Sequence, residues 1–595
     1  MPYAPSPRWD LETIFAGGPH GAPFRAEFAA VKQAIEGLIP RTEDISTNDL
    51  DEIRALLNEI QLLGERLGEL RTYASCNFAA DTTSADAREA DVLTAELVNR
   101  LNRADVPIQS LLADVDDASF AALLADPSMD EMAPLLRHRR EGAKRLTLRP
   151  KAMQALLNDL EREALHGWGQ LYDNLSGTLE VELALPGEAP KKVGIAVVNG
   201  MRGHADEAVR KAAYDGAAKA WSGAADTCAM ALTHITGARQ TRFDRLGVDE
   251  LACTLHDNRV DRGILDAMWI AADHARPKLT AYLARKAKLL GKPKLDAWDT
   301  LAPMPDADKT ISWEQAQDVV VEAFDGIDPD MGAFAREALR KRWIDAESRP
   351  GRMPGGFCAP VPRSKQSRIF LTFTNTVDTM LTLAHELGHS FHDEVLFQNP
   401  IARREVTSAL AETASTFAEA VVRDAAIANA PDAAARVQLL DQDLQAGVAF
   451  LMNIPARFQF EQKLFQLRRQ GPFRADQLRA EMVDCLKVTH ADALNTYDDL
   501  FWASKLHFYI SSFGFYNWSY TFGYLFSASV YQRAREEGPA FRATYRKLLA
   551  RTGWDDTRAI GRDVLGEDLG DPAFWIRATK PLTKGVDEFL ATTAT

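Results

Sequence analysis

The amino-acid sequence predicts a mostly α-helical protein with a small amount of β-sheet. Residues 49–75 and 84–115, for example, place apolar side chains three and four positions apart, which is the spacing of one helical face. These segments are rich in alanine and leucine, which have high helix propensities. Strand-like patterns occur in only two places. We therefore expect helices to provide most of the core.

The first strand-like pattern predicts a β-hairpin. Residues 178–185 (TLEVELAL) alternate apolar and polar side chains, and residues 192–198 (KVGIAVV) follow after a Pro-Gly turn. The second pattern, residues 368–373 (RIFLTF), comes after a stretch rich in glycine and proline. We place a domain boundary after the hairpin. Residues 1–198 then form a helical N-terminal domain, and residues 199–595 form a larger, catalytic domain.

Composition excludes several classes of protein. The 595 residues include 84 acidic and 69 basic side chains, which give a net charge of −15 at pH 7. A nucleic-acid-binding protein needs a concentrated basic surface, so we expect no nucleic-acid partner. The five cysteines are scattered and never form a CxxC pair. This pattern is typical of reduced thiols and predicts a cytoplasmic protein without a disulfide framework.

The uncharged stretch at residues 506–532 is long enough to be considered as a membrane span. It contains Asn517, a histidine and several serines and tyrosines, which make it a poor lipid-facing helix. We interpret it as a buried or cavity-lining segment. The opening residues, MPYAPSPRWDLETIF, lack the basic segment and apolar run of a secretory signal peptide. We therefore expect no membrane association.

The strongest functional signal is an HExxH motif at residues 385–389. On a helix, His385 and His389 lie on the same face, where both imidazoles can bind one zinc ion. Glu386 lies beside them and can touch a zinc-bound water without binding the metal itself. Residues 377–396 have helical periodicity, and Asn375 or Thr376 can cap that helix. The motif therefore has the helical setting that metal binding requires.

A catalytic zinc ion needs a third protein ligand. Residues 404–422 predict a second helix, on which Glu405, Glu412 and Glu419 are seven positions apart and therefore near one face. Small and apolar residues surround Glu412 and Glu419, and a buried carboxylate needs a cation or strong hydrogen bonds. Helical geometry alone leaves open which of the three glutamates reaches the metal.

These two segments resemble a known family. AHELGHSFH at residues 384–392, together with ETASTFAE at residues 412–419, is similar to the thimet oligopeptidase and oligoendopeptidase F metallopeptidases, with the oligoendopeptidase F branch the more similar. Further similarity lies at residues 7–15, 201–216, 355–360 and 515–527, so the resemblance spans nearly the whole chain. It implies that Glu412 is the third zinc ligand and that Glu419 orients another ligand. It also implies a helical ellipsoid with a deep central channel, the zinc at its floor and a small β-sheet beside the site.

The aromatic segment near the C-terminus adds candidate catalytic residues. In the resembling family, tyrosines and a histidine from this region stabilise the tetrahedral intermediate, in which charge develops on the former carbonyl oxygen. The match to the family pattern implies this role for Tyr524, with Tyr516 and His507 as further candidates. Tyr520 is a candidate for substrate binding or for packing alone.

Gly355, Gly356 and Phe357 are candidate substrate-binding residues. They begin a predicted edge strand, and adjacent glycines admit the close approach of another backbone. An extended peptide substrate that pairs with the strand requires such an approach. The alternative is an ordinary turn before a strand.

Together these patterns predict a zinc-dependent endopeptidase that hydrolyses short unstructured oligopeptides. One zinc ion per chain would activate a water, and Glu386 would take the proton as this water attacks the scissile carbonyl. Two alternatives stay open: a zinc aminopeptidase with the same metal site, and a non-catalytic helical peptide-binding protein. Cleavage of N-terminally blocked peptides distinguishes the first alternative, and zinc content distinguishes the second. The sequence does not indicate an oligomeric state.

Overall fold

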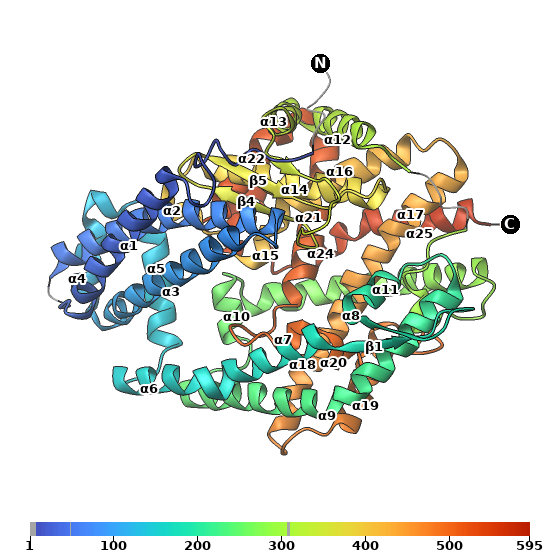
Figure 1. The fold of residues 1–595 in the computed structure, drawn as a ribbon, viewed down its shortest axis with the longest axis horizontal. Helices are drawn as coiled ribbons and strands as arrows, with labels where there is room; N and C mark the ends of the chain where they lie inside the picture. Colours follow the sequence, from blue (N-terminus) through green and yellow to red (C-terminus); the bar gives the residue numbers. More distant parts are fainter. Residues whose placement is uncertain (1–6, 48, 306–309, 595) are drawn as a thin grey trace. The chain divides into compact units, whose positions relative to one another are not determined.

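The computed structural model describes residues 7–47, 49–305 and 310–594, and it is mostly helical, as the sequence predicts (Figure 1). The chain forms two compact units. The first comprises Met1–Arg145, Lys309–Ala425 and Val530–Gly566, and the second comprises Leu146–Asp308, Ala426–Ser529 and Glu567–Thr595. Because these units alternate along the chain, they do not test the domain boundary at residue 198, which stays a prediction. Within the described ranges, no helix combines the length and apolar composition that crossing a membrane requires.

The first unit opens with five helices around one apolar core (blue in Figure 1). The two helices predicted first are confirmed as α2 and α3, and they are capped by Asp49 and Ser84, whose side chains accept backbone N–H groups. Leu56, Leu63 and Leu70 on α2 are almost completely buried, in agreement with the predicted apolar face. The helices of this unit are α1 (Ala22–Glu43), α2 (Leu50–Ala80), α3 (Ala85–Asp114), α4 (Asp117–Ala125), α5 (Ala133–Arg145), α12 (Trp313–Ile327), α13 (Pro329–Arg340), α14 (Val377–Leu396), α15 (Ser408–Ala411), most of α16 (Thr413–Ala428), α22 (Phe541–Arg551) and α23 (Thr557–Ile560).

A small sheet in the first unit packs against α14. Its strands are β3 (Ile344–Asp345), β4 (Phe357–Val361) and β5 (Gln366–Phe370), in the order β3-β5-β4. β3 pairs parallel to β5, whereas β4 pairs antiparallel to it, with Phe357 opposite Phe370. The predicted edge strand is therefore confirmed as β4. The strand predicted at residues 368–373 begins two residues earlier, at Gln366, and ends at Phe370.

The second unit contains the predicted hairpin and the other long helices. Its elements are α6 (Lys151–Glu161), α7 (Gly167–Thr178), β1 (Glu180–Leu183), β2 (Lys191–Gly194), α8 (Ile195–Gly200), α9 (Glu207–Leu246), α10 (Ala252–Asp257), α11 (Arg262–Leu289), α17 (Ala433–Val448), α18 (Ile454–Arg468), α19 (Ala475–Thr489), α20 (Phe501–Ser504), most of α21 (Trp518–Glu537), α24 (Pro572–Ala578) and α25 (Lys580–Thr592).

The hairpin is confirmed, but both strands are shorter than predicted, since β1 covers Glu180–Leu183 within the predicted 178–185 and β2 ends at Gly194. β1 and β2 pair antiparallel, and Glu180 at the start of β1 lies opposite Gly194 at the end of β2. The residues that follow have no further strand residue opposite them, so they form the helical turn α8 instead. This turn buries Val198 against Val181 and Ala213. Burial of one apolar side chain therefore replaces the strand pairing that the alternating sequence suggested.

Candidate active site

Helix α14 presents both histidines of the HExxH motif on one face. Thr376 is the N-cap, and its side chain accepts a hydrogen bond from the backbone of Thr379, so the second of the two predicted caps is the one used. The Nε2 atoms of His385 and His389 lie 3.1 Å apart. Two imidazole nitrogens at this separation can bind the same ion.

Glu412 completes a triangle of ligand atoms. Its Oε2 lies 3.4 Å from the Nε2 atoms of both His385 and His389. A tetrahedral zinc ion about 2.0–2.1 Å from each ligand places those ligands about 3.3 Å apart, so sides of 3.1 and 3.4 Å fit zinc. Among the described residues, these three form the one group of histidine, cysteine and acidic side chains with metal-binding geometry.

The helix predicted at residues 404–422 is shorter than expected, and Glu405 lies outside it. The predicted helix covered residues 404–422, but the observed helix begins at Ser408 and is interrupted at Glu412, which ends α15 before α16 begins. Arg404 is held outside the helix by an ion pair with Glu65 and a hydrogen bond to the Asn399 carbonyl. Glu405 therefore precedes the helix and does not share a face with the other two glutamates.

Further polar side chains hold two members of the ligand triangle, His385 and Glu412. Glu419 accepts from His385 Nδ1 at 2.6 Å, and Arg423 donates to the other Glu419 oxygen at 3.0 Å. Ser415 donates to Glu412 Oε2 at 2.8 Å. The expected role of Glu419 in orienting a zinc ligand stays a prediction. Ser415 and Arg423 had no expected role from the sequence, although Arg423 follows Glu419 at i+4, a spacing that allows helical ion pairs.

The pKa values show that these groups favour a positive charge between them. Burial alone would lower the pKa of His385, but its hydrogen bond with Glu419 and the nearby carboxylates outweigh burial and raise it to about 9. Burial would raise the pKa of Glu412, but the hydrogen bond with His389 and the charges of both histidines lower it to about 2. A cation bound by these atoms would supply the charge that the carboxylates stabilise.

Glu386 lies beside the triangle with a carboxylate that is buried and incompletely hydrogen-bonded. The residue is 5% exposed, and its Oε2 has no hydrogen-bond partner among the described residues. Burial raises the pKa of Glu386, although the two histidines oppose this shift. A carboxyl group in this state can accept a proton more readily than a fully hydrated one.

Gly356 leaves space directly over Glu386. A Cβ atom at position 356 would lie 3.2 Å from Glu386 Oε1 and 3.3 Å from the Phe370 carbonyl oxygen. Gly355 adopts a φ of +96°, a conformation that favours glycine. The Phe357 ring stacks on Phe370 with centroids 5.1 Å apart, so its side chain contributes to packing under the sheet. Substrate binding at these three residues stays a prediction.

Gly388, within the HExxH motif, allows α14 and α16 to approach closely. A Cβ atom there would lie 2.6 Å from the Ala414 carbonyl oxygen and 2.7 Å from the Ser415 Cα. These residues directly follow Glu412, so the approach that Gly388 permits also sets how far Glu412 lies from the histidines. The sequence analysis did not assign a role to this glycine.

Replacing Gly388 by alanine should separate α14 from α16 and disturb the ligand triangle. We expect the free energy of unfolding to fall by about 1–3 kcal/mol, because the added methyl group overlaps backbone atoms that cannot rotate away. Denaturant unfolding measures this change. Gly64 on α2 is a matched control, since a Cβ there would meet no atom within 4 Å. Gly64→Ala should therefore leave stability unchanged or raise it, and an equal loss in both variants would contradict the role of Gly388.

The second unit contains the four candidates from the aromatic segment. His507 Nε2 lies 3.2 Å from the Tyr520 hydroxyl, and the His507 ring stacks with that of Tyr516 at a centroid distance of 5.8 Å. Tyr516 and Tyr520 also make an edge contact. Tyr524 lies one turn further along α21 and stacks on Phe450. Three of the four candidates therefore form one cluster, and their part in catalysis stays a prediction.

Two buried charged residues hold the loop that carries Tyr516. Arg239 from α9 donates to the carbonyl oxygens of Ile510 and Phe513, and Glu461 from α18 accepts from the Phe515 backbone N–H at 2.6 Å. Both residues are less than a tenth exposed. Their distance from the loop in the sequence explains why local patterns gave no signal for them.

Comparison with known proteins agrees with the geometry. A sequence profile of Peptidase family M3 matches residues 201–579, which is more than half of the chain. The chain is 23% identical to Oligopeptidase PepF of Bacillus subtilis over 545 residues, covering 89% of this chain and 79% of the relative. It is 22% identical to Group B oligopeptidase PepB of Streptococcus agalactiae over 592 residues, which cover 95% of this chain and 94% of the relative.

Solved structures show the same fold. Oligoendopeptidase-F from Enterococcus faecium superposes with a TM-score of 0.70 at 15% identity, covering 96% of this chain and 98% of that one. A candidate peptidase from Chlamydophila abortus superposes with a TM-score of 0.82 at 17% identity, and the match covers 99% of this chain and 98% of that one. The family match, the relatives and the shared fold support one conclusion: the chain belongs to peptidase family M3 and is a peptidase.

Proposed function

We propose that this protein is a zinc-dependent endopeptidase that hydrolyses short, unstructured oligopeptides. The observation that carries the proposal is the triangle of His385, His389 and Glu412 ligand atoms, with the unpartnered carboxylate oxygen of Glu386 beside it. Two nitrogen ligands and one carboxylate are the donor set of many catalytic zinc sites. The described residues contain no disulfide, which also favours the cytoplasm as its location, since thiols stay reduced there.

The residues of the triangle fit zinc in both donor chemistry and spacing. Zinc bound there would lower the pKa of a coordinated water to about 7 and polarise a carbonyl oxygen. Glu386 accepts the proton of the attacking water and delivers it to the leaving amine nitrogen. Glu419 accepts a hydrogen bond from His385 Nδ1–H, which leaves the Nε2 lone pair directed toward Glu412 and His389. Arg423 holds Glu419 in that position.

Hydrogen-bond donors of the aromatic segment stabilise the oxyanion in this proposal. Tyr524 is the first candidate, and Tyr516 and His507 are the others. The pKa of His507 is lowered to about 4, by burial and then by nearby cations, so its imidazole is neutral at pH 7. A neutral imidazole still donates one N–H, and a tyrosine hydroxyl donates one O–H.

Tyr524→Phe should lower kcat by about a hundred- to a thousandfold, with KM changed much less. The substitution removes one hydroxyl and almost no volume, and losing one oxyanion donor has an effect of this size. Steady-state kinetics on a blocked peptide measures the change. Tyr497→Phe is a suitable control, because Tyr497 lies in the same unit and its hydroxyl bonds the Leu494 backbone. An unchanged kcat in Tyr524→Phe would show that Tyr524 serves packing alone. Tyr516 and His507 would then be the remaining candidates for the oxyanion donor.

The proposal is tested by metal content and by cleavage of blocked peptides of graded length, with and without a chelator. We expect one zinc ion per chain and internal cleavage of peptides of about ten residues that the chelator abolishes. We also expect folded proteins to resist cleavage. Cleavage only of peptides with a free N-terminus would favour an aminopeptidase. Metal-free protein that binds peptides without cleaving them would favour the non-catalytic alternative.

A further inference from the structure

Three cationic side chains in the second unit have no acidic partner. Within the described residues, no carboxylate oxygen lies within 4.0 Å of the side-chain nitrogens of Arg202, Arg457 or Lys505. Some buried cations of this unit have a carboxylate partner, as Lys286 has in Asp441 at 2.9 Å, whereas Arg239 donates to backbone carbonyl oxygens. A partly buried cation without a counter-ion is unfavourable for folding, so such a group is expected to serve another purpose.

Arg457 and Lys505 each lie over the ring of Phe501. The Arg457 guanidinium carbon lies 5.0 Å from the centroid of Phe501, and Lys505 Nζ lies 4.8 Å from it. Arg457 also donates to the side-chain oxygens of Asn453, at 2.8 Å, and Asn517, at 3.3 Å. These partners are neutral. They fix the position of the guanidinium but do not cancel its charge.

The pKa values of these cations reflect their burial and the like charges around them. Burial, followed by the charges of Arg457 and Arg202, lowers the pKa of Lys505 to about 7, and only Asp498 opposes the shift. Burial is also the main cause that lowers the pKa of Arg457 to about 10. An anion bound between these cations would relieve both shifts, because an opposite charge favours the protonated form.

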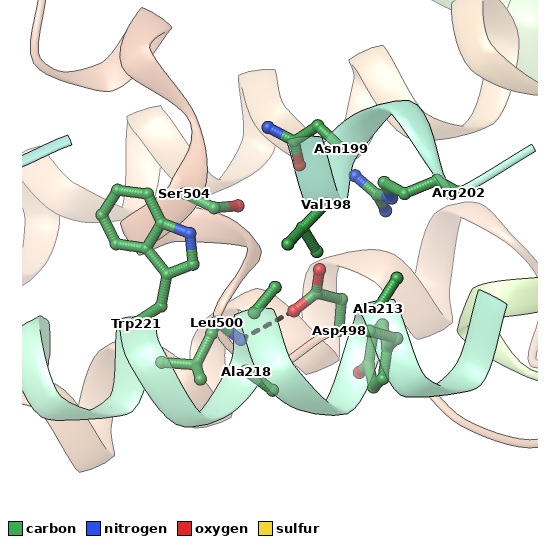
Figure 2. A pocket seen from close by; sticks show the side chains of 11 residues that line it. Val198, Asn199, Arg202, Ala213, Ala218, Trp221, Asp498, Leu500 and Ser504 are labelled. Carbon is green, nitrogen blue, oxygen red and sulfur yellow. Dashed lines mark hydrogen bonds between the residues drawn. The ribbon is translucent and has the colours of Figure 1, made fainter. Parts of the chain in front are cut away.

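A pocket lies beside Arg202. Figure 2 shows it with Arg202, Asp498 and Ser504, the residue before Lys505, among the side chains that line it. Its other walls include the apolar side chains of Val198 and Trp221. Arg202 is the cation of the three that faces this pocket, and the Asp498 carboxylate faces it as well.

The cations also act on the aromatic cluster of the proposed catalytic residues. Arg457 and Lys505 both contribute to the lowered pKa of His507, so they lie near it. The Nδ1 atom of His507 is buried and has no hydrogen-bond partner among the described residues, while its Nε2 atom contacts Tyr520. A ligand of the cations would therefore lie close to residues that we assign to substrate.

We propose that Arg457 and Lys505, together with Arg202, bind the terminal carboxylate of a peptide substrate. The inference rests on the proposed peptidase function. Guanidinium and ammonium groups form strong, charge-assisted hydrogen bonds with carboxylates, and a linear peptide carries one carboxylate at its end. An acidic side chain within the peptide offers the same chemistry, so the experiment must distinguish the two sources.

The test compares peptides that differ only in their carboxylates. One N-terminally blocked peptide ends in a free acid and its partner ends in an amide, and a second pair carries internal Glu or Gln with an amide end. Dissociation constants are measured by fluorescence anisotropy on zinc-loaded Glu386→Gln protein, and kcat/KM is measured on the wild-type enzyme. We expect the free acid to bind about ten- to a hundredfold more tightly than the amide.

Substitutions of Lys505 assign the preference to this site. Lys505→Met should remove most of it, while Lys487→Met, which removes an exposed lysine of the same unit, should leave it intact. In the wild type the preference should fall between pH 6 and pH 8, since Lys505 loses its proton near pH 7 whereas a terminal carboxylate does not titrate there. Arginine keeps its charge over this range, so the preference of Lys505→Arg for the free acid should stay nearly constant between pH 6 and pH 8. Equal pH dependence in both proteins would contradict the role of Lys505.

The outcomes separate this inference from the proposed function. Equal affinity for acid and amide would overturn the carboxylate site, even if the enzyme cleaves both peptides. A preference for internal Glu over Gln without a preference at the terminus would overturn the assignment to the terminal carboxylate. Absence of hydrolysis by the wild-type protein would contradict the peptidase proposal but leave the binding comparison valid.

Discussion

Glu386→Gln is expected to lower kcat by about a thousandfold while fold and zinc content stay near those of the wild type. Glutamine has the size and hydrogen-bonding capacity of glutamate but cannot accept a proton at neutral pH. The Glu386 carboxylate has one oxygen without a protein partner, so the substitution breaks no protein hydrogen bond at that atom. Single-turnover kinetics, with zinc measured on the same samples, separates loss of chemistry from loss of metal.

Glu394→Gln is the matched control for this variant. Glu394 lies on the same helix, α14, outside the ligand triangle. The same change of charge there should leave kcat within about twofold, as is usual for a substitution away from the reacting groups. If Glu386→Gln kept a tenth of the wild-type activity, Glu386 would not be the general base.

Glu412→Ala is expected to lose bound zinc and activity together. The substitution removes one of three ligand atoms, and two histidines alone hold zinc weakly. The loss of affinity should exceed the ten- to hundredfold that follows removal of an outer hydrogen bond. Zinc analysis after dialysis against a buffered metal solution measures it. Full zinc occupancy in Glu412→Ala would refute the assignment of the third ligand.

The other two glutamates provide graded comparisons. Glu419 contacts His385 but is not part of the ligand triangle, so Glu419→Ala should weaken zinc affinity about ten- to a hundredfold. Glu405 precedes α15, so Glu405→Ala should change zinc binding little. Zinc loss in Glu405→Ala with full retention in Glu412→Ala would reverse the order that the geometry indicates.

Much of the site could be predicted because its residues are close together in the sequence. The four-residue spacing of His385 and His389 fixes them on one helical face wherever that helix lies. The seven-residue spacing of Glu412 and Glu419 also places them two turns apart, and the resemblance to known metallopeptidases assigned them different roles. Helical periodicity likewise predicted α2, α3 and α14, because the apolar face of a helix repeats locally.

Local patterns were wrong where contacts between distant segments decide the structure. Residues 192–198 have a strand-like pattern, but β1 is too short to pair with all of them, and burial of Val198 favours a helical turn. The helix predicted at residues 404–422 begins late, since Arg404 binds Glu65 far away in the sequence, and it is interrupted at Glu412. Rules based on residue spacing cannot predict contacts with residues so distant in the sequence.

The sequence by itself determined the helical fold class and the three residues of the proposed ligand triangle. The fold class and the pairing of His385 with His389 follow from spacings of three and four residues along single helices, which the covalent geometry of the chain fixes. The choice of Glu412 came from the resemblance to known metallopeptidases. Only the tertiary structure decided that Gly388 brings α14 against α16, that Glu419 contacts His385, and that Arg457 and Lys505 share the Phe501 ring. These contacts depend on how helices pack, and packing is set by side chains from separate segments that meet only when the chain is folded.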